Sequence, residues 1–127
     1  MFLDLFPSHH KHEVVPLLTL HAGLYDGSEI TALAENRMLT FATAMGPTRI
    51  GLRQIASMKN ISHVVALRRY LWANKFEIEF RDGCRLIGTP RHPRALPLYD
   101  NGAPHARGRL QLWEIDWLRI ETDGALA

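Results

Sequence analysis

Cysteine is almost missing from this sequence, because Cys84 is the single one among 127 residues. One thiol cannot form an internal disulfide, and it excludes a zinc site built on several cysteines. Long apolar runs are missing too, since no stretch approaches the roughly 18 apolar residues that span a bilayer. The apolar segment 1–7 carries Asp4, lacks a basic start and ends at Pro7, unlike a secretory signal peptide. These absences predict a cytoplasmic protein without a membrane segment.

The motifs of common enzyme classes are absent as well. There is no Gly-x-Gly-x-x-Gly, no phosphate-binding Gly-Lys-Ser/Thr loop and no His-Glu-x-x-His. The sequence therefore predicts a non-enzymatic protein with no catalytic residues and no cofactor. His9, His10 and His12 form a dense cluster, but further ligands at the fixed spacings of a structural metal site do not accompany them. We predict no metal site, and loose binding of Zn²⁺ or Ni²⁺ by these histidines stays an open alternative.

Charge is low overall and uneven along the chain. The net charge is +2, and residues 1–67 balance at zero. Residues 68–109 carry nine Lys/Arg against four Asp/Glu, whereas residues 110–127 carry one arginine against four acidic residues. Arginine supplies twelve of the fifteen basic residues, and its planar guanidinium pairs bidentately with phosphate and carboxylate. This composition favours an anionic ligand, although solvated surface arginines would give it as well.

Two segments, residues 20–60 and 76–120, show the same features in the same order, which predicts an internal repeat. Each segment opens with alternating apolar residues, the mark of a half-buried strand. Each then reaches an Asp-Gly pair, which between two such runs indicates a tight hairpin turn of the primed type. The pairs are Asp26-Gly27 and Asp82-Gly83.

The later parts of the two segments correspond as well. Third strands are predicted at residues 38–43 and 95–99, and Pro97 makes the second of these an edge or irregular strand, because proline cannot donate to a sheet ladder. The final blocks, residues 49–59 and 109–119, align without a gap and predict a strand, one helical turn and a last strand. Their inward apolar positions are Ile50, Leu52 and Ile55 in one block and Leu110, Leu112 and Ile115 in the other.

Residues 61–75 lie between the two segments. The helical spacing of Val64, Leu67 and Leu71 predicts a short helix over this range, and Ser62 is a suitable N-cap for it. Val64 and Val65 also fit the alternative of a strand that continues from the first segment. The whole chain, residues 1–127, is predicted to form one mainly β domain.

The stretch 78–88 resembles the first sequence motif of small SH3-like barrels of the Sm-like fold, including its bacterial RNA-chaperone branch. In that motif an apolar strand leads to Asp-Gly, and a second glycine allows the next strand to bend. The resemblance implies two related SH3/Sm-like strand-hairpin units, as one small barrel or a fused double barrel. Ala32 stands at the bend-glycine position of the first segment, and the RNA-contacting residues of the family are not matched, so no binding residue is carried over.

The best candidate binding surface is the loop-rich stretch over residues 88–109. Basic side chains that flank an aromatic ring can hold a phosphate backbone while a base stacks. The candidate ligand-binding residues are Arg91, Arg94, Tyr99, Arg107 and Arg109. We predict a binding module for nucleic acid, RNA in the first place, or for another polyanion. The plain alternative is a solvated Pro/Gly-rich loop.

Tryptophan gives the competing prediction. Trp113 and Trp117 lie in the final block of the second segment, where the first has Arg53 and Ser57, and Trp72 lies between the segments. Because tryptophan is enriched at interfaces, these three residues predict contacts between segments or subunits. The chain would then be a homo-oligomeric structural or adaptor protein. A metal or small-anion sensor is the third class.

Overall fold

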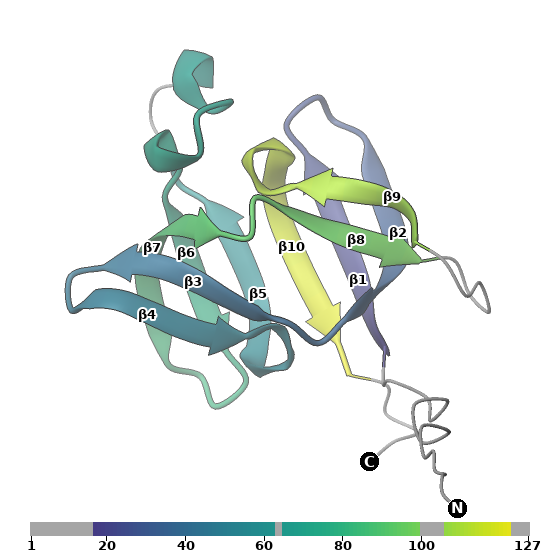
Figure 1. Cartoon of the computed structure of the whole chain (residues 1–127), viewed down its shortest axis with the longest axis horizontal. Coiled ribbons are helices and arrows are strands. Elements are labelled where there is room, and N and C mark those ends of the chain that lie inside the picture. The colour runs from purple at the N-terminus through teal and green to yellow at the C-terminus, as the bar shows by residue number, and fades with distance from the viewer. Residues whose placement is uncertain (1–16, 63–64, 100–105, 123–127) are drawn as a thin grey trace, which may run out of the picture.

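The computed structural model describes residues 17–62, 65–99 and 106–122, which form strands and short 3₁₀ helices (Figure 1). The strands are β1 (Leu17–Leu24), β2 (Glu29–Glu35), β3 (Met38–Thr43), β4 (Gly46–Gly51), β5 (Ile55–Asn60), β6 (Phe76–Phe80), β7 (Arg85–His92), β8 (Ala95–Tyr99), β9 (Ala106–Gln111) and β10 (Ile115–Glu121). The 3₁₀ helices are η2 (Leu52–Gln54), η3 (Val65–Leu67), η4 (Leu71–Ala73) and η5 (Leu112–Glu114). The predicted mainly β class is confirmed, and the predicted third strands have the predicted bounds.

All ten strands belong to one antiparallel sheet, in the order β4-β3-β7-β6-β5-β10-β1-β2-β8-β9, and the sheet is not closed. We call β4-β3-β7-β6-β5 the first half and β10-β1-β2-β8-β9 the second half. The β3–β4 hairpin pairs with β7, and the β8–β9 hairpin lies beside β2, so each half combines strands from early and late parts of the chain. The halves join where β5 and β10 pair through three residue pairs.

Two short connectors carry the chain from one half into the other. Asn36-Arg37 links β2 to β3, and Pro93-Arg94 links β7 to β8. The favoured two-residue hairpin turns, types I′ and II′, need a positive φ at one or both of their central residues. No residue of either connector has a positive φ. The strands that flank a connector therefore do not fold back on each other, and the chain crosses the sheet instead.

Both Asp-Gly pairs form hairpin turns, as predicted, but the primed turn type is wrong. Gly27 has a φ of 93° and Gly83 a φ of 91°, whereas neither aspartate has a positive φ. The Gly27 amide donates to the Leu24 carbonyl at 2.9 Å, and the Gly83 amide donates in the same way to Phe80 at 2.9 Å. This is the pattern of a three-residue loop that ends in a left-handed glycine, so the glycine alone takes the unusual conformation.

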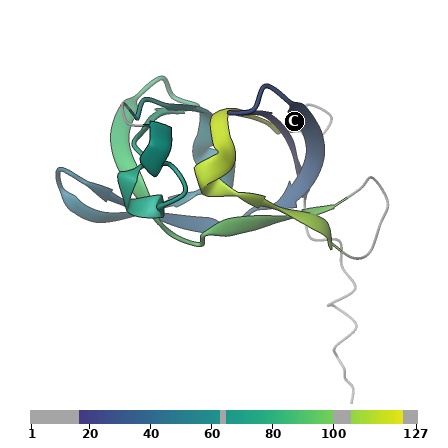
Figure 2. The ribbon, with the colours of Figure 1, turned by 90° about the horizontal axis from the view of Figure 1, so that it is seen from above.

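Each half of the sheet curls so that its front hairpin faces its back strands, which is clearest from above (Figure 2). The side chains between these layers form one core cluster. The apolar positions predicted from the final blocks are all buried in it: Ile50, Leu52, Ile55, Leu110, Leu112 and Ile115. The Pro97 strand is not an edge strand, because β8 lies between β2 and β9, but its pairing with β2 is limited to Leu33 and Tyr99.

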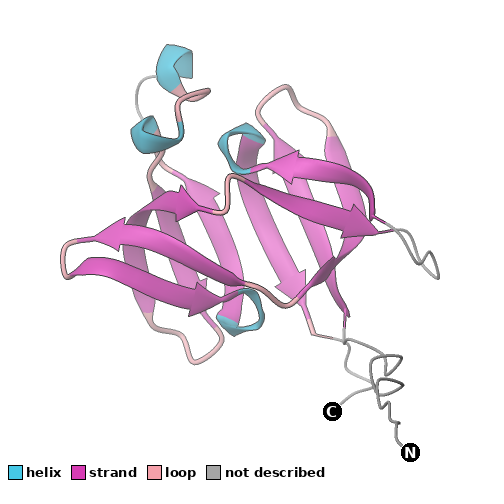
Figure 3. Cartoon of the chain, in the orientation of Figure 1, coloured by secondary structure: helices cyan, strands magenta, loops and turns pink. Residues whose placement is uncertain are grey.

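The predicted helix over residues 61–75 is not confirmed. The described part of this segment contains η3 and η4, each of three residues (Figure 3). The buried Asn74 side chain explains the difference, because its amide donates to the carbonyls of Arg68 at 2.7 Å and Tyr70 at 2.9 Å. A continuous α-helix would need those carbonyls for its own ladder, and side-chain bonds of this kind compete with it.

Candidate functional site

Two adjoining hollows lie where the β7–β8 connector crosses between the halves. The first, of about 300 Å³, is lined by residues that include Tyr70, Trp72, Arg91 and Arg94. The second, of about 490 Å³, is lined by residues that include Arg37, His92, Arg94 and Arg109. Arg94 lines both, so the hollows form one continuous surface. We call it the arginine groove and define it by Arg37, Tyr70, Trp72, Arg91, Arg94 and Arg109.

Backbone hydrogen bonds fix the two connectors that supply this groove. The Leu52 amide, at the start of η2, donates to the Arg37 carbonyl at 2.8 Å. The Leu112 amide, at the start of η5, donates to the Arg94 carbonyl at 2.9 Å. Each arginine thus projects from a backbone position that a buried leucine holds in place. Arg91 comes from the end of β7 and Arg109 from the edge strand β9.

Some arginines of the described chain have a carboxylate partner, and others have none. Arg68 pairs with Asp116, Arg85 with Glu77 and Arg119 with Glu121. Within residues 17–62, 65–99 and 106–122, no carboxylate lies within 4.0 Å of the guanidinium groups of the four groove arginines, all of which are exposed. The groove therefore gathers positive charge that the described side chains leave uncompensated, which suits an anionic ligand.

Two aromatic rings stand at one end of the groove. Tyr70 and Trp72 stack with ring centroids 5.9 Å apart and an interplanar angle of 25°. The Arg69 guanidinium lies 5.2 Å from the centre of the Tyr70 ring. Trp72 remains 66% exposed, the second highest value among the large apolar side chains of the described residues. An exposed ring of this size costs hydrophobic free energy and gives a flat surface for a ligand.

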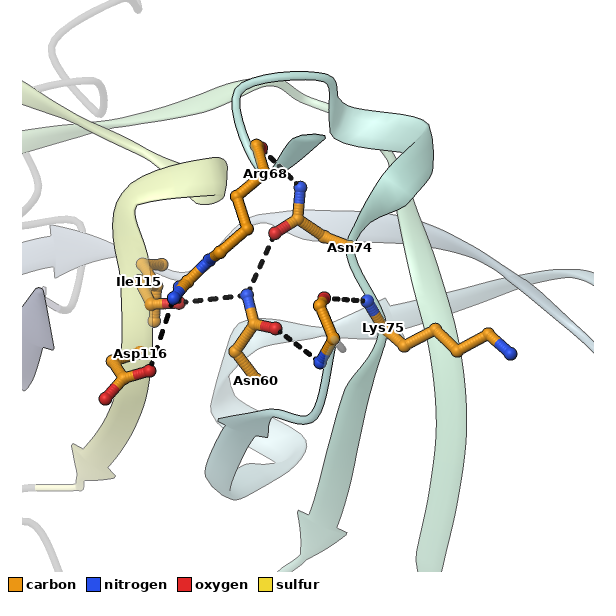
Figure 4. A network of polar contacts seen from close by, with 7 residues as sticks. Asn60, Arg68, Asn74, Lys75, Ile115 and Asp116 are labelled. Atoms are coloured by element: carbon orange, nitrogen blue, oxygen red, sulfur yellow. Dashed lines mark hydrogen bonds and ion pairs between the residues drawn. The ribbon is translucent and has the colours of Figure 1, made fainter. Parts of the chain in front are cut away.

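A buried polar network holds the segment that carries these rings (Figure 4). Arg68, only 7% exposed, donates to the Ile115 carbonyl at 2.6 Å and lies 3.5 Å from the Asp116 carboxylate. The Asn60 amide donates to the Asn74 side-chain oxygen at 2.9 Å and to the same Ile115 carbonyl at 3.2 Å. The network ties the 61–75 segment to both β5 and β10, so the two rings rest on a fixed base rather than on a free loop.

The structure brings together part of the predicted ligand-binding set. Arg91, Arg94 and Arg109 line the groove, and Trp72, predicted as an interface residue, lines it with them. The side chain of Arg107 lies outside the described residues, as does the histidine cluster of residues 9–12.

Tyr99 lies apart from Arg91 and Arg94. It lines a third hollow of about 290 Å³ that Arg109 shares, and its hydroxyl donates to the Glu35 carboxylate at 3.0 Å. This hydrogen bond raises the pKa of the Tyr99 phenol. Because the hydroxyl already has a carboxylate partner, Tyr99 is better explained as a link between β8 and β2 than as a ligand contact.

The other two tryptophans do not form one patch with Trp72. Trp113 packs against Tyr25 with ring centroids 5.8 Å apart. Trp117 lies on β10 beside β5, over Gly23, where an added Cβ would come within 2.1 Å of the indole nitrogen. Both rings therefore cover parts of the second half of the sheet. The prediction that Trp72, Trp113 and Trp117 make contacts between segments or subunits stays a prediction, and Trp117 lies opposite Lys59 where the two halves join.

Two groove residues escaped the sequence prediction. Arg37 directly precedes the third strand of the first segment, just as Arg94 precedes the third strand of the second. That correspondence was available from the sequence, but the convergence of the two side chains depends on the crossing connectors. Tyr70 gave no signal, because an Arg-Tyr pair in a predicted helix is typical of a solvated face.

Other chemically active side chains of the described regions occur singly or in turns. Hydrogen bonds from Ser28 lower the pKa of Asp26, and the Cys84 amide lowers that of Asp82. The neighbouring Asp82 in turn raises the pKa of the exposed Cys84 thiol, which lowers its nucleophilicity. The described residues contain no group of three or more His, Cys, Asp or Glu that could hold a metal ion. Their longest helices are far too short to cross a membrane.

Comparisons with known proteins do not add to this geometry. No protein-family model, no curated protein sequence and no solved structure matches the chain. The resemblance to Sm-like barrels therefore stays a prediction from residues 78–88.

Proposed function

We propose that this protein is a non-enzymatic module that binds nucleic acid in the arginine groove. The observation that carries the proposal is the sharing of Arg94 by the two hollows, which joins an aromatic end and a cationic end into one surface. A polyanion with regularly spaced charges can contact several groove arginines at once. Each such contact releases condensed counterions, which supplies much of the binding free energy.

The groove arginines suit a nucleic acid better than they suit a single small anion. The planar fork of arginine donates two parallel hydrogen bonds to one phosphate and also stacks on flat rings. Three of the groove arginines line the second hollow and two line the first, with Arg94 common to both, so their charges extend over the two hollows. RNA is the preferred form of the ligand, because it is the ligand class of the family that residues 78–88 resemble.

As part of this proposal, we interpret the chain as two related SH3/Sm-like units that have exchanged their second hairpins. Matching hydrogen bonds in the two halves support it. The Tyr25 amide donates to Glu114 in η5 at 3.0 Å, and the Arg81 amide donates to Gln54 in η2 at 3.1 Å. Each first hairpin thus contacts the 3₁₀ turn that follows the other unit's second hairpin. This interpretation places Arg37 and Arg94 at equivalent points of the two units.

Binding to a labelled single-stranded oligonucleotide at increasing salt tests the proposal. If about three phosphates are neutralised, the logarithm of the binding constant should fall with the logarithm of salt concentration with a slope of about −2. Arg94→Glu should weaken binding by at least roughly tenfold, about 1.4 kcal/mol. Arg85→Glu is the matched control, since Arg85 lies at the opposite end of β7 and pairs with Glu77 at 3.8 Å. Binding that ignores salt, or equal losses in both variants, would contradict the proposal.

A second candidate function is assembly with further copies of the chain. It rests on β4 and β9, which form the two outer edges of the sheet and leave backbone groups available for another strand. Pro47 and two glycines within β4 weaken that edge as a template, which is why we place this function second. Sedimentation at several protein concentrations, with and without oligonucleotide, separates the two functions.

A further inference from the structure

We infer that the ligand of the arginine groove is single-stranded and that one of its bases stacks on Trp72. This inference rests on the proposed function and adds the class of nucleic acid and the point of base contact. It concerns the first hollow, whose volume of about 300 Å³ lies at the lower end of the range for small-ligand pockets, about 300–1,000 Å³.

The arrangement of the rings leaves one aromatic face for a base. The Tyr70 ring already has two neighbours, the Trp72 ring and the Arg69 guanidinium. The Trp72 ring stacks on Tyr70 alone among the described aromatic side chains, and 66% of the residue is exposed. A base placed on Trp72 would continue a stack of Arg69, Tyr70 and Trp72. Stacking of this kind is available only to a base that is not already paired and stacked within a duplex.

The position of this face relative to charge fits one nucleotide. Arg91 and Arg94 line the same hollow as the two rings, so a base on Trp72 would have its own phosphate within reach of these arginines. Arg94 also lines the second hollow, which leads the neighbouring phosphates toward Arg37 and Arg109. The groove thus supplies a ring for the base at one end and cations for the backbone along the rest.

Buried polar side chains hold the backbone that carries the two rings, and burying them costs free energy. Asn74 is fully buried and donates to the Tyr70 carbonyl at 2.9 Å. Arg68 is buried with its Nε atom unpartnered among the described groups, while its terminal nitrogens bond to β10. A buried charge and a buried amide are expensive to maintain. Here they fix the backbone on either side of Tyr70, and this pre-organisation would lower the entropy that a stacked ligand loses.

The test compares three probes on the full chain: a uridine RNA oligonucleotide, an abasic oligonucleotide of the same length, and a duplex of the same sequence. The uridine strand should bind at least roughly tenfold more tightly than the abasic strand, which corresponds to about 1.4 kcal/mol. Trp72→Ala should remove this preference, and Trp72→Phe should restore most of it. Met45→Ala is the control, because Met45 is 77% exposed and is not among the residues lining either hollow.

The outcomes separate this inference from the proposed function. Equal binding of the uridine and abasic strands, or of single strand and duplex, would overturn the stacking inference while salt-dependent binding through Arg94 still stood. The absence of salt-dependent binding to any of the three probes would overturn the proposed function, and the inference with it. Circular dichroism of Trp72→Ala checks that the variant is folded, which we expect from the exposure of the ring.

Discussion

On the ladder between β6 and β5, Glu79 lies opposite Ser57, whereas at the matching point between β1 and β10, Gly23 lies opposite Trp117. The next pairs along are alike, since Ile78 and Met58 are buried in one half as Ala22 and Leu118 are in the other. The two halves of the sheet therefore share their inward side and differ on their outward side. The inward residues of both halves belong to one core cluster, and the two halves differ in their outward residues.

The largest difference between the halves is the 61–75 segment. It connects β5 to β6 within the first half, and its described part contains η3 and η4. This segment supplies Tyr70 and Trp72 to the groove and the buried Arg68 and Asn74 to its support. The groove is consequently unsymmetrical, with aromatic rings at one end only, although its two connectors correspond. If the proposed function holds, such a groove would bind a strand in one direction.

Asn74→Ala should have the largest effect on this comparison. It removes three hydrogen bonds from a fully buried side chain and leaves the Asn60 amide and two carbonyls short of partners. We expect a loss of about 3 kcal/mol in the free energy of unfolding, measured by urea denaturation. Asn36→Ala is the control, because Asn36 is exposed and accepts one bond from the Arg53 amide. Equal midpoints for wild type and Asn74→Ala would show that the network does not support the first half.

Gly23→Ala should have the next largest effect on stability. The added Cβ would approach the Trp117 indole nitrogen to 2.1 Å, so the ring must move and the packing of the second half is disturbed. Overpacking of this kind costs about 2 kcal/mol. The double variant Gly23→Ala with Trp117→Ser places a serine opposite residue 23, as Ser57 lies opposite Glu79 in the first half. It should recover part of that loss. Thermal unfolding of the single and double variants measures both, and a stable single variant would contradict the close contact.

Arg37→Glu and Arg94→Glu sharpen the comparison of the two connectors. Both arginines line the second hollow, but only Arg94 lines the first as well. We expect Arg94→Glu to weaken oligonucleotide binding by roughly tenfold, about 1.4 kcal/mol, and Arg37→Glu by roughly threefold. Fluorescence anisotropy at one salt concentration gives both values. A larger loss for Arg37→Glu would mean that the ligand follows the second hollow without reaching the aromatic end.

Low pH should destabilise the two Asp-Gly hairpin turns to a similar extent, and this effect on stability should be the smallest of those predicted. Hydrogen bonds from Ser28 lower the pKa of Asp26, and the Cys84 amide lowers that of Asp82. A folded-state pKa below the unfolded value means that the stabilisation is present above the unfolded pKa and is lost as pH falls through the folded one. The urea concentration at the midpoint of unfolding should therefore decrease as the pH drops below about 4, where aspartate titrates. Asp26→Ala should flatten this dependence more than Asp82→Ala, because Asp26 accepts the Ser28 hydroxyl at 2.6 Å, whereas the side-chain donor to Asp82 is the weaker thiol of Cys84.

Local signals in the sequence predicted the elements well, and the reason is their short range. Alternation gave the strands at 38–43 and 95–99, and the two Asp-Gly pairs marked the turns because glycine tolerates a left-handed φ. The same local logic failed at 61–75, where helical spacing predicted a helix. The tertiary bonds of Asn74 decided that segment, and nothing in the spacing of its apolar residues foretold them.

The sequence by itself determined which residues face the core and where the chain turns, since both follow from side-chain alternation and glycine geometry. It did not determine which hairpin completes which half. The final blocks carry the same apolar spacing, so either hairpin satisfies either half, and the local pattern cannot choose between them. The tertiary structure made that choice through connectors that cross between the halves, and this crossing brings Arg37 and Arg94 to one surface.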